Sequence, residues 1–209
     1  MTVELVTTDG IFALDGDEWE VTNNIWIVGD DREVVVFDAA HDAQPIIDGV
    51  GGRRVKAIVL THGHNDHINA AVPLRDALDA PILLHRDDQM LWDVVWPGHD
   101  TDGAVIPGET IAVGGHTLGI LHTPGHSPGC CCFHDQASGL VISGDTLFCG
   151  GPGATGRTYS DEPTILRSIM SQLLPLPDET VVHTGHGETT TIGDEREVVM
   201  ARASELGIA

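Results

Sequence analysis

Short apolar stretches separated by polar and glycine-containing turns recur along the chain, a pattern typical of β-strands. Val55–Leu60 is the clearest case, because a single lysine interrupts its run of apolar residues. The Asn23–Asn24 pair interrupts another stretch and predicts a bend or bulge there. The expected strands are Ile11–Leu14, Val21–Val28, Glu33–Phe37, Val55–Leu60, Pro81–Leu84, Thr110–Val113, Thr117–His122, Cys130–His134, Leu140–Ser143 and Thr180–His183.

Other segments carry apolar residues at the spacing of one helix face. Asp42 is a candidate N-cap for the first of them, and Asp194 near the start of the last one is favourable to a helix dipole. The expected helices are Asp42–Val50, Ile68–Leu78, Arg86–Trp96, Pro163–Leu174 and Ile192–Leu206. Strands and helices therefore mix along the chain, which indicates an α/β or α+β protein.

Length and composition limit the domain organisation and the cellular location that this chain can have. A chain of 209 residues with 41% hydrophobic residues suits one domain, expected over 1–209. The N-terminus lacks the basic and apolar parts of a signal peptide, and no apolar run approaches the ~20 residues of a membrane span. We therefore expect a cytoplasmic protein. Cys130, Cys131 and Cys132 are consecutive, which predicts strand residues rather than disulfides.

The charge excludes several kinds of partner. The chain holds 32 acidic and only 10 basic residues, a formal net charge of −22. Proteins that bind nucleic acids neutralise phosphates with Lys and Arg, so we expect no nucleic acid partner. An anionic membrane surface is disfavoured for the same reason. A small-molecule substrate fits this composition, and the oligomeric state stays open.

Four metal-competent side chains lie within six residues. His62, His64, Asp66 and His67 directly follow the apolar strand Val55–Leu60. In an extended segment alternate side chains point the same way, so His62 and His64 can reach one ion together. Asp66 and His67 can then serve a second ion nearby. Imidazole and carboxylate suit zinc, and also iron or manganese, so the segment predicts a metal site.

The order His62-x-His64-x-Asp66-His67 resembles the signature of the metallo-β-lactamase-fold superfamily. Three further motifs of that family follow in the family's order. Thr123–Gly129 resembles the loop that supplies His126, and Ser143–Phe148 resembles the strand end that supplies Asp145. The segment 184–187 resembles the loop that supplies the last ligand, His186.

The resemblance implies a four-layer αββα sandwich with a dinuclear metal centre. His62, His64 and His126 would hold one divalent ion, and Asp66, His67 and His186 the other, with Asp145 bridging; zinc is the expected metal, with iron or manganese as alternatives. A bridging hydroxide would attack the substrate carbonyl. Asp66 would act catalytically by orienting this hydroxide, and Asp38 would support the ligand loops through hydrogen bonds.

The branch most similar to this chain is glyoxalase II, which hydrolyses acyl-thioesters of glutathione. The carboxylate at Asp145 disfavours a β-lactam substrate, since the true metallo-β-lactamases carry their bridging carboxylate elsewhere. Glyoxalase II holds the thiol's peptide with a Gly-basic-x-Tyr segment, and Arg157 and Tyr159 are the matching candidates here. No C-terminal glutathione-binding helical domain is expected after His186, so another small thiol, such as mycothiol, is an alternative.

Rival functions remain open at this point. A persulfide dioxygenase shares these motifs and uses a single iron, and a lactone hydrolase needs the same hydroxide. A non-enzymatic metal-binding protein is the alternative from another class, although all seven ligand positions are filled. His41 and Cys149 are further residues that can approach the site.

Overall fold

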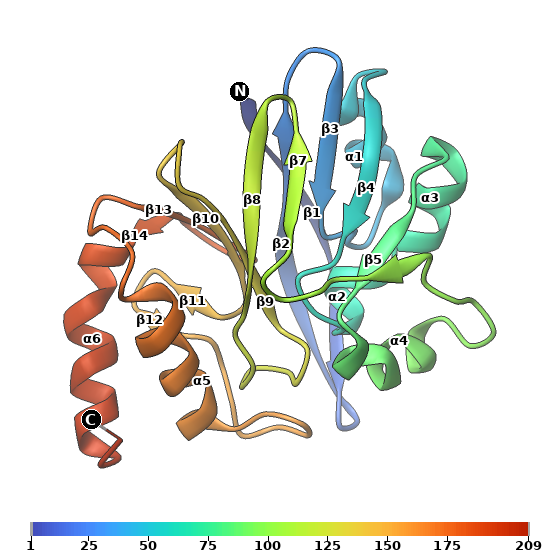
Figure 1. Cartoon of the computed structure of the whole chain (residues 1–209). Coiled ribbons are helices and arrows are strands. Elements are labelled where there is room, and N and C mark those ends of the chain that lie inside the picture. Colours follow the sequence, from blue (N-terminus) through green and yellow to red (C-terminus); the bar gives the residue numbers. More distant parts are fainter. Residues whose placement is uncertain (1, 209) are drawn as a thin grey trace.

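The computed structural model describes residues 2–208, and Figure 1 shows two β-sheets with helices on either side of the pair. The first sheet has the strand order β1-β2-β3-β4-β5-β6. Its strands β3, β4 and β5 run parallel, and β1 and β2 form a long antiparallel hairpin. Its strands are β1 (Thr2–Leu14), β2 (Asp17–Gly29), β3 (Glu33–Phe37), β4 (Arg54–Val59), β5 (Ile82–Leu84) and β6 (Gly103–Ala104).

The second sheet has the order β14-β13-β10-β9-β8-β7. Strand β9 is antiparallel to both β8 and β10, and β13 is parallel to β10, so β8, β10 and β13 all point the same way. Its strands are β7 (Thr110–Val113), β8 (His116–His122), β9 (Cys131–Asp135), β10 (Leu140–Gly144), β13 (Val181–Thr184) and β14 (Thr190–Thr191). A small separate hairpin is formed by β11 (Leu147–Phe148) and β12 (Gly151–Pro152).

Helices cover the outer face of each sheet. Those beside the first sheet are α1 (Ala43–Val50), α2 (Asn65–Ile68), α3 (Ala71–Leu78) and α4 (Gln89–Val95), the last preceded by a 3-10 turn, Arg86–Asp88. Those beside the second are α5 (Glu162–Ser168), continued by a π-helix at Ile169–Leu173, and α6 (Ile192–Glu205). In Figure 1 these two groups of helices flank opposite sides of the paired sheets.

Three hydrophobic clusters correspond to the three interfaces of a four-layer sandwich. Ile25 and Ile27 of β2 pack toward the helices of the first sheet, together with Ile46 of α1. Trp26 and Val28, on the opposite face of the same strand, pack against the second sheet. This alternation follows from the two-residue period of a strand. A third cluster joins the second sheet to α5 and α6. The expected αββα sandwich is confirmed.

Several elements differ from the sequence prediction, and two of these differences lie near the strand ends that carry the site. The segment Ile68–Leu78 is divided between α2 and α3, because Ala70 donates its backbone N–H to Ala39 and the chain turns there. The predicted bend at Asn23–Asn24 is wrong. Both asparagines pair regularly with β1, within a strand that is far longer than the short hairpin expected from the apolar pattern. Their polar side chains are accommodated because they bond within the site described below.

Neighbouring strand ends of the two sheets meet at one edge of the sandwich. The segments after β3 and β4 leave the first sheet there, and those after β8, β10 and β13 leave the second. No helix among residues 2–208 is long and apolar enough to span a membrane. The domain expected over 1–209 includes Met1 and Ala209, which lie outside the described residues.

Candidate metal centre

Every residue expected to bind metal lies on a segment that leaves the carboxyl end of a strand. The segment after β4 supplies His62 and His64, and it runs on into α2, which carries Asp66 and His67. His126 follows β8. Asp145 follows β10 directly, and His186 follows β13. The motifs are far apart in the sequence but adjacent in space, because the strand ends converge.

Three imidazoles form the first ligand group. Nδ1 of His64 lies 3.1 Å from Nε2 of His62 and 2.9 Å from Nε2 of His126. All three side chains are buried. Together they can hold one metal ion. Ligand atoms about 2.1 Å from a zinc ion are separated by comparable distances, which supports this geometry.

Asp66, His67 and His186 form the second ligand group. Nε2 of His67 lies 3.2 Å from Nε2 of His186, and Oδ2 of Asp66 lies 3.3 Å from the latter nitrogen. His67 is fully buried, whereas the side chain of His186 is 24% exposed. The opening toward solvent is therefore on the His186 side of this group.

Asp145 lies between the two groups. Its Oδ2 is 3.5 Å from Nε2 of His126 in the first group and 3.5 Å from Nε2 of His186 in the second. Its Oδ1 is 3.3 Å from Nε2 of His67. The carboxylate therefore occupies the position from which a bridging ligand reaches two ions, and the whole His/Asp cluster fits a dinuclear metal centre.

Hydrogen bonds on the outer side of the rings determine which nitrogens face the centre. Nδ1–H of His67 donates to Asp38, Nδ1–H of His126 to the carbonyl of Ala154, and Nδ1–H of His186 to the carbonyl of Thr22. Each of these bonds uses Nδ1 and leaves Nε2 directed at the other ligands. In the metal-free protein the neighbouring carboxylates raise the pKa of His67 and His186, so Nε2 of these rings holds a proton that a metal ion would replace. The donor set therefore fits metal ions.

The electrostatics of the cluster also suit cations. Burial, followed by the neighbouring imidazoles, lowers the pKa of His62 well below its usual value, and burial together with His126 lowers the pKa of His64 to about 3. Burial opposes the charge on Asp145, but His67 and His186 outweigh it and hold its pKa well below the usual range. His62 and His64 are therefore neutral and the bridging carboxylate is ionised, which are the forms that bind metal.

The metal-free protein is expected to lose stability as the pH rises from about 6.5 to 10. Burial disfavours the charge on His186, but Asp145 and Asp66 outweigh burial and raise its pKa from 6.5 to about 10. A group with a raised folded pKa stabilises fully below its unfolded pKa, and this contribution disappears as the pH passes the folded value. The melting temperature of chelator-treated protein, followed by circular dichroism across this range, measures the effect.

Metal-loaded protein is the control for this prediction. Bound metal replaces the proton on His186, so its melting temperature should not show the same fall. Equal falls in the metal-free and metal-loaded proteins would contradict the assignment of His186 to the ligand set.

Asp38 holds two of the ligand histidines through hydrogen bonds on the side of the rings away from the metal centre, as the sequence predicted. Its Oδ2 accepts hydrogen bonds from Nδ1 of His67 and from the hydroxyl of Thr61, which in turn accepts from Nδ1 of His62. Its Oδ1 accepts the backbone N–H of Thr61 at 2.7 Å. Asp38 has a φ of 66°, a left-handed conformation that is unfavourable for a non-glycine residue. Through these bonds, one carboxylate orients a ligand from each group.

Sequence reasoning missed Asp88, which joins the two loops that carry the first group. This fully buried carboxylate accepts the backbone N–H groups of Gly63 and Gly129 and the hydroxyl of Ser127. A Cβ at Gly63 would lie 3.0 Å from Cβ of Asp88 and 2.9 Å from Cβ of Leu91. Gly63 therefore permits close packing of the ligand loop against these residues. The burial of Asp88 is a property of the fold, so no signal in the sequence marked this residue.

The two asparagines of β2 were also missed, because they had been interpreted as a bend. Asn24 donates from Nδ2 to the carbonyls of Thr184 and Gly187, and its backbone N–H donates to Gly185. These bonds fix the loop that carries His186. Asn23 is fully buried, and its Nδ2 donates to Oδ2 of Asp66 at 3.1 Å. Two polar residues in succession within a mostly apolar strand were the signal in the sequence.

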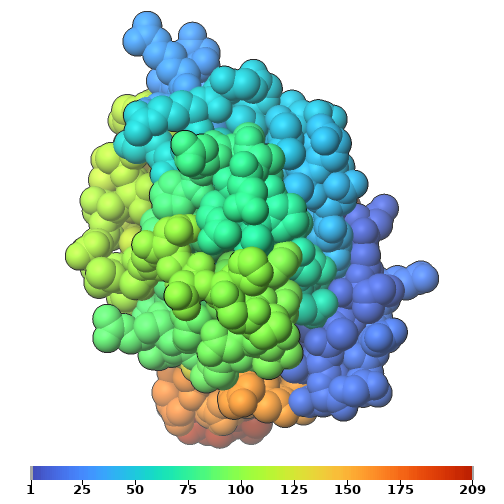
Figure 2. Space-filling view, turned by 90° about the vertical axis from the view of Figure 1, so that its right-hand side faces the viewer, coloured from blue at the N-terminus to red at the C-terminus, as the bar shows by residue number. Residues whose placement is uncertain are grey.

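Arg157 lies at the tip of the β1–β2 hairpin. Its guanidinium donates to Asp17 at 3.0 Å and lies 4.1 Å from the ring centroid of Trp19. Trp19 stacks on Phe12, whose ring centroid is 5.4 Å from that of His64. The arginine is thus connected to the first ligand group by an aromatic stack. Figure 2 shows the orange segment that precedes α5 next to the blue hairpin.

Tyr159, the other expected substrate contact, is 52% exposed and has a φ of 69°. The adjacent Thr158 donates to Asp15 through both its backbone N–H and its hydroxyl. The segment therefore crosses to the hairpin tip and is held there.

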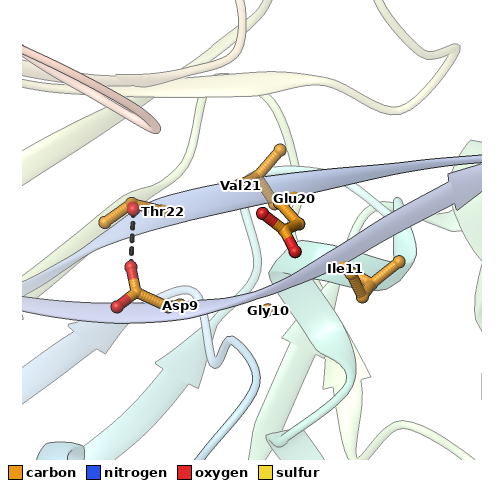
Figure 3. Close-up of a pocket in the computed structure, with 6 residues that line it drawn as sticks. All are labelled: Asp9, Gly10, Ile11, Glu20, Val21 and Thr22. Carbon is orange, nitrogen blue, oxygen red and sulfur yellow. Dashed lines mark hydrogen bonds between the residues drawn. The ribbon is translucent and has the colours of Figure 1, made fainter.

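A hollow of about 470 Å³ lies on the hairpin itself, lined by Asp9, Gly10, Ile11, Glu20, Val21 and Thr22 (Figure 3). The hydroxyl of Thr22 donates to Asp9 across the two strands, as the dashed line in Figure 3 marks. The carbonyl of Thr22 accepts from His186, so the hollow borders the second ligand group. The ligand residues themselves do not line it.

Two further residues singled out in the sequence have different surroundings. His41 contacts Asn23 and so lies beside the second ligand group, whereas Cys149 is exposed. A separate group, His85, Asp87 and His122, also brings potential ligands together. The imidazoles of His85 and His122 are stacked with an interplanar angle of 21°. Nε2 of His122 donates to the carbonyl of Pro128, and Nδ1 of His85 accepts the backbone N–H of Asp87, so each ring already uses one nitrogen within the protein.

Several known proteins are similar to this chain in sequence and in fold. A model described as the metallo-β-lactamase superfamily matches residues 19–186. Hydroxyacylglutathione hydrolase GloC of Haemophilus influenzae is 32% identical over 187 residues, which cover 82% of this chain and 87% of GloC. The structure of the BLEG-1 B3 metallo-β-lactamase has a TM-score of 0.76 at 30% identity, covering 91% of this chain and 97% of that one. TTHA1623 in a di-iron-bound form has a TM-score of 0.73 at 32% identity, covering 85% and 94%.

Proposed function

The chain belongs to the metallo-β-lactamase superfamily, and we propose that it is a dinuclear metal-dependent hydrolase of acyl-thioesters of a small thiol. The observation that carries the proposal is the pair of ligand groups joined by Asp145. Similarity to a hydroxyacylglutathione hydrolase supports a thioester substrate, and similarity to a protein solved in a di-iron-bound form supports two ions. Zinc is the proposed metal, with iron or manganese as alternatives.

In this proposal the ions would supply hydroxide near neutral pH and polarise the substrate carbonyl. The protein contributes orientation. Burial disfavours the charge on Asp66, but His67 and His186 outweigh burial and lower its pKa to about 2, so the carboxylate is ionised at neutral pH. Its Oδ1 is buried and has no hydrogen-bond partner among residues 2–208. This oxygen is therefore available to accept a proton of the attacking water and to orient that water toward the carbonyl.

The substrate's thiol portion would bind between the β1–β2 hairpin and the segment that carries Arg157 and Tyr159. Trp19 and Phe12 offer apolar surface there, and Arg157 offers the nearby positive charge. Because Arg157 already pairs with Asp17, we propose that it assists binding rather than the chemical step. In that case R157A should raise KM for the preferred substrate and leave kcat unchanged, whereas a fall in kcat alone would contradict this role.

The function is tested by anaerobic thiol release from a panel of acyl-thioesters, using protein loaded with zinc, iron or manganese. We expect rapid release from at least one substrate, with loss of activity on chelation and recovery when metal is restored. Separate assays measure the hydrolysis of lactones and of a β-lactam, and an aerobic assay measures oxygen uptake with a persulfide. The β-lactam is included because the chain is similar to the BLEG-1 B3 metallo-β-lactamase.

Turnover of only the β-lactam or the lactone would still support a metal-dependent hydrolase, but it would overturn the proposal that the substrate is a thioester. Oxygen uptake with a persulfide, without thioester hydrolysis, would overturn hydrolysis in favour of a mononuclear iron dioxygenase. Two metal ions per chain in the active protein would support the dinuclear form. The small-molecule partner, the absence of nucleic acid and membrane partners, and the cytoplasmic location stay predictions from the sequence.

A further inference from the structure

A series of hydrogen bonds, here called the relay, lies beside the second ligand group and begins at Asn69, which follows α2. Oδ1 of Asn69 accepts the backbone N–H of His41 at 2.5 Å. A backbone N–H can only donate, so this bond identifies the amide oxygen of Asn69 without ambiguity. The amide nitrogen then faces Nδ1 of His41 at 3.1 Å and must donate to it. Nδ1 of His41 therefore carries no proton.

The protonation of His41 determines the orientation of Asn23. A neutral imidazole without a proton on Nδ1 carries it on Nε2. Nε2 of His41 lies 2.8 Å from Oδ1 of Asn23 and donates to it. The amide of Asn23 must then direct Nδ2 toward the metal centre, where it donates to Oδ2 of Asp66 at 3.1 Å. The same nitrogen lies 3.2 Å from Nε2 of His67 and 3.4 Å from Nε2 of His186, and Asp66 is the one partner of the three that can only accept.

The backbone at His41 and at Gly10 of β1 accommodates the imidazole of His41. His41 has a φ of 60°, in the left-handed region that is unfavourable for a non-glycine residue. Its ring lies against β1 at Gly10, where an added Cβ would come within 2.1 Å of Nδ1. The hydroxyl of Thr8 donates to the carbonyl of Ala40 at 2.9 Å and holds the preceding loop against β1. Asn23 is 0% exposed, so water does not compete for its amide.

We propose that Asn23 and His41 are positioning residues for Asp66, and that their relay keeps Oδ2 of this carboxylate hydrogen-bonded while Oδ1 stays free for the attacking water. The inference rests on the proposed function for the role of Asp66. Without the donor from Asn23, the carboxylate can rotate and offer either oxygen to the reaction. Outer hydrogen bonds of this kind contribute about 10- to 100-fold to the activity or metal affinity of a metal site.

Four variants test the relay. N23A and H41L each remove one link, H41Q retains an N–H donor at position 41, and the double variant N23A/H41L removes both links. We expect kcat for the best thioester to fall about 10- to 100-fold in N23A and H41L, with KM and the metal content unchanged. H41Q should recover most of the activity. Because the two residues act in series, the double variant should be no slower than the slower single variant.

Two controls separate positioning from folding. H134L removes an imidazole from β9, in the other sheet and outside the metal centre, and it should retain wild-type kcat. Melting temperatures of all variants show whether they fold. A loss of metal content and stability in parallel with kcat, or a double variant that multiplies the two single effects, would overturn the relay.

A measurement that needs no substrate decides the geometry independently. The ¹⁵N signals of His41 in labelled protein should be those of a neutral ring protonated at Nε2, and the side-chain amide signals of Asn23 should shift in H41L but not in H41Q. A ring protonated at Nδ1 would overturn the relay even in an active enzyme. If the panel yields no thioester turnover, the proposed function fails, and these signals still decide whether the relay exists.

Discussion

Replacement of Asp145 by asparagine is expected to lower kcat/KM for the best thioester about a thousandfold or more. Its carboxylate approaches His126 in one ligand group and both His67 and His186 in the other. The amide keeps the shape and removes the negative charge that both ions would share. Loss of several kcal/mol of transition-state stabilisation corresponds to a rate effect of about this size. Kinetics and metal content of D145N, with excess metal present, measure it.

D135N is the matched control for this substitution. Asp135 is another buried aspartate of the second sheet, and it bonds to His116 and Ser138, outside the metal centre. The same chemical change there should leave the activity of the folded, metal-loaded protein within a few-fold of wild type. Activity of D145N comparable to that of D135N would contradict a bridging role for Asp145 and with it the dinuclear centre.

Replacement of Asp88 by alanine is expected to destabilise the protein by about 4 kcal/mol. Three buried donors, on Gly63, Ser127 and Gly129, would lose their acceptor, and each buried group without a partner costs about 1–3 kcal/mol. For a chain of this length such a loss lowers the melting temperature by about 10 °C. Because these donors lie in the loops that carry the first ligand group, metal affinity should fall as well, by about 10- to 100-fold.

S127A provides the comparison for Asp88. It removes the hydroxyl that bonds to Asp88 and contacts Sγ of Cys130, and it leaves the carboxylate bonded to both backbone N–H groups, so a loss of about 1 kcal/mol is expected. Chemical denaturation of the metal-free variants measures stability, and metal titration measures affinity. An effect of D88A no larger than that of S127A would show that Asp88 does not connect the two loops.

The candidate ligand residues could be identified from the sequence because the chemistry of a metal site is concentrated in side-chain type and short spacing. His62, His64, Asp66 and His67 are neighbours in the sequence, and the strand before them is apolar. Periodicity likewise identified most strands and helices, since burial on one face leaves a repeat of two or 3.6 residues. Most of β1, from Thr2 to Gly10, escaped this reasoning, because polar residues and a glycine interrupt its apolar positions.

The residues that support the centre were not predictable in the same way. Asp88 looks like an ordinary polar residue before a helix until Gly63 and Gly129 are brought to either side of it. Asn23 looks like a strand breaker until β2 carries it next to Asp66 and His41. Each depends on partners from distant parts of the chain, so no local pattern records its role.

The sequence by itself determined the αββα architecture, through the resemblance that its motifs carry, and the identity of the side chains able to bind metal. Only the tertiary structure decided how those side chains are held: by Asp38 and Asp88 behind the ligand loops, and by Asn23 and His41 beside Asp66. The physical reason is that the donor atoms of a metal ligand are set by residue type. Its orientation depends on hydrogen bonds to groups that meet only when both sheets pack together.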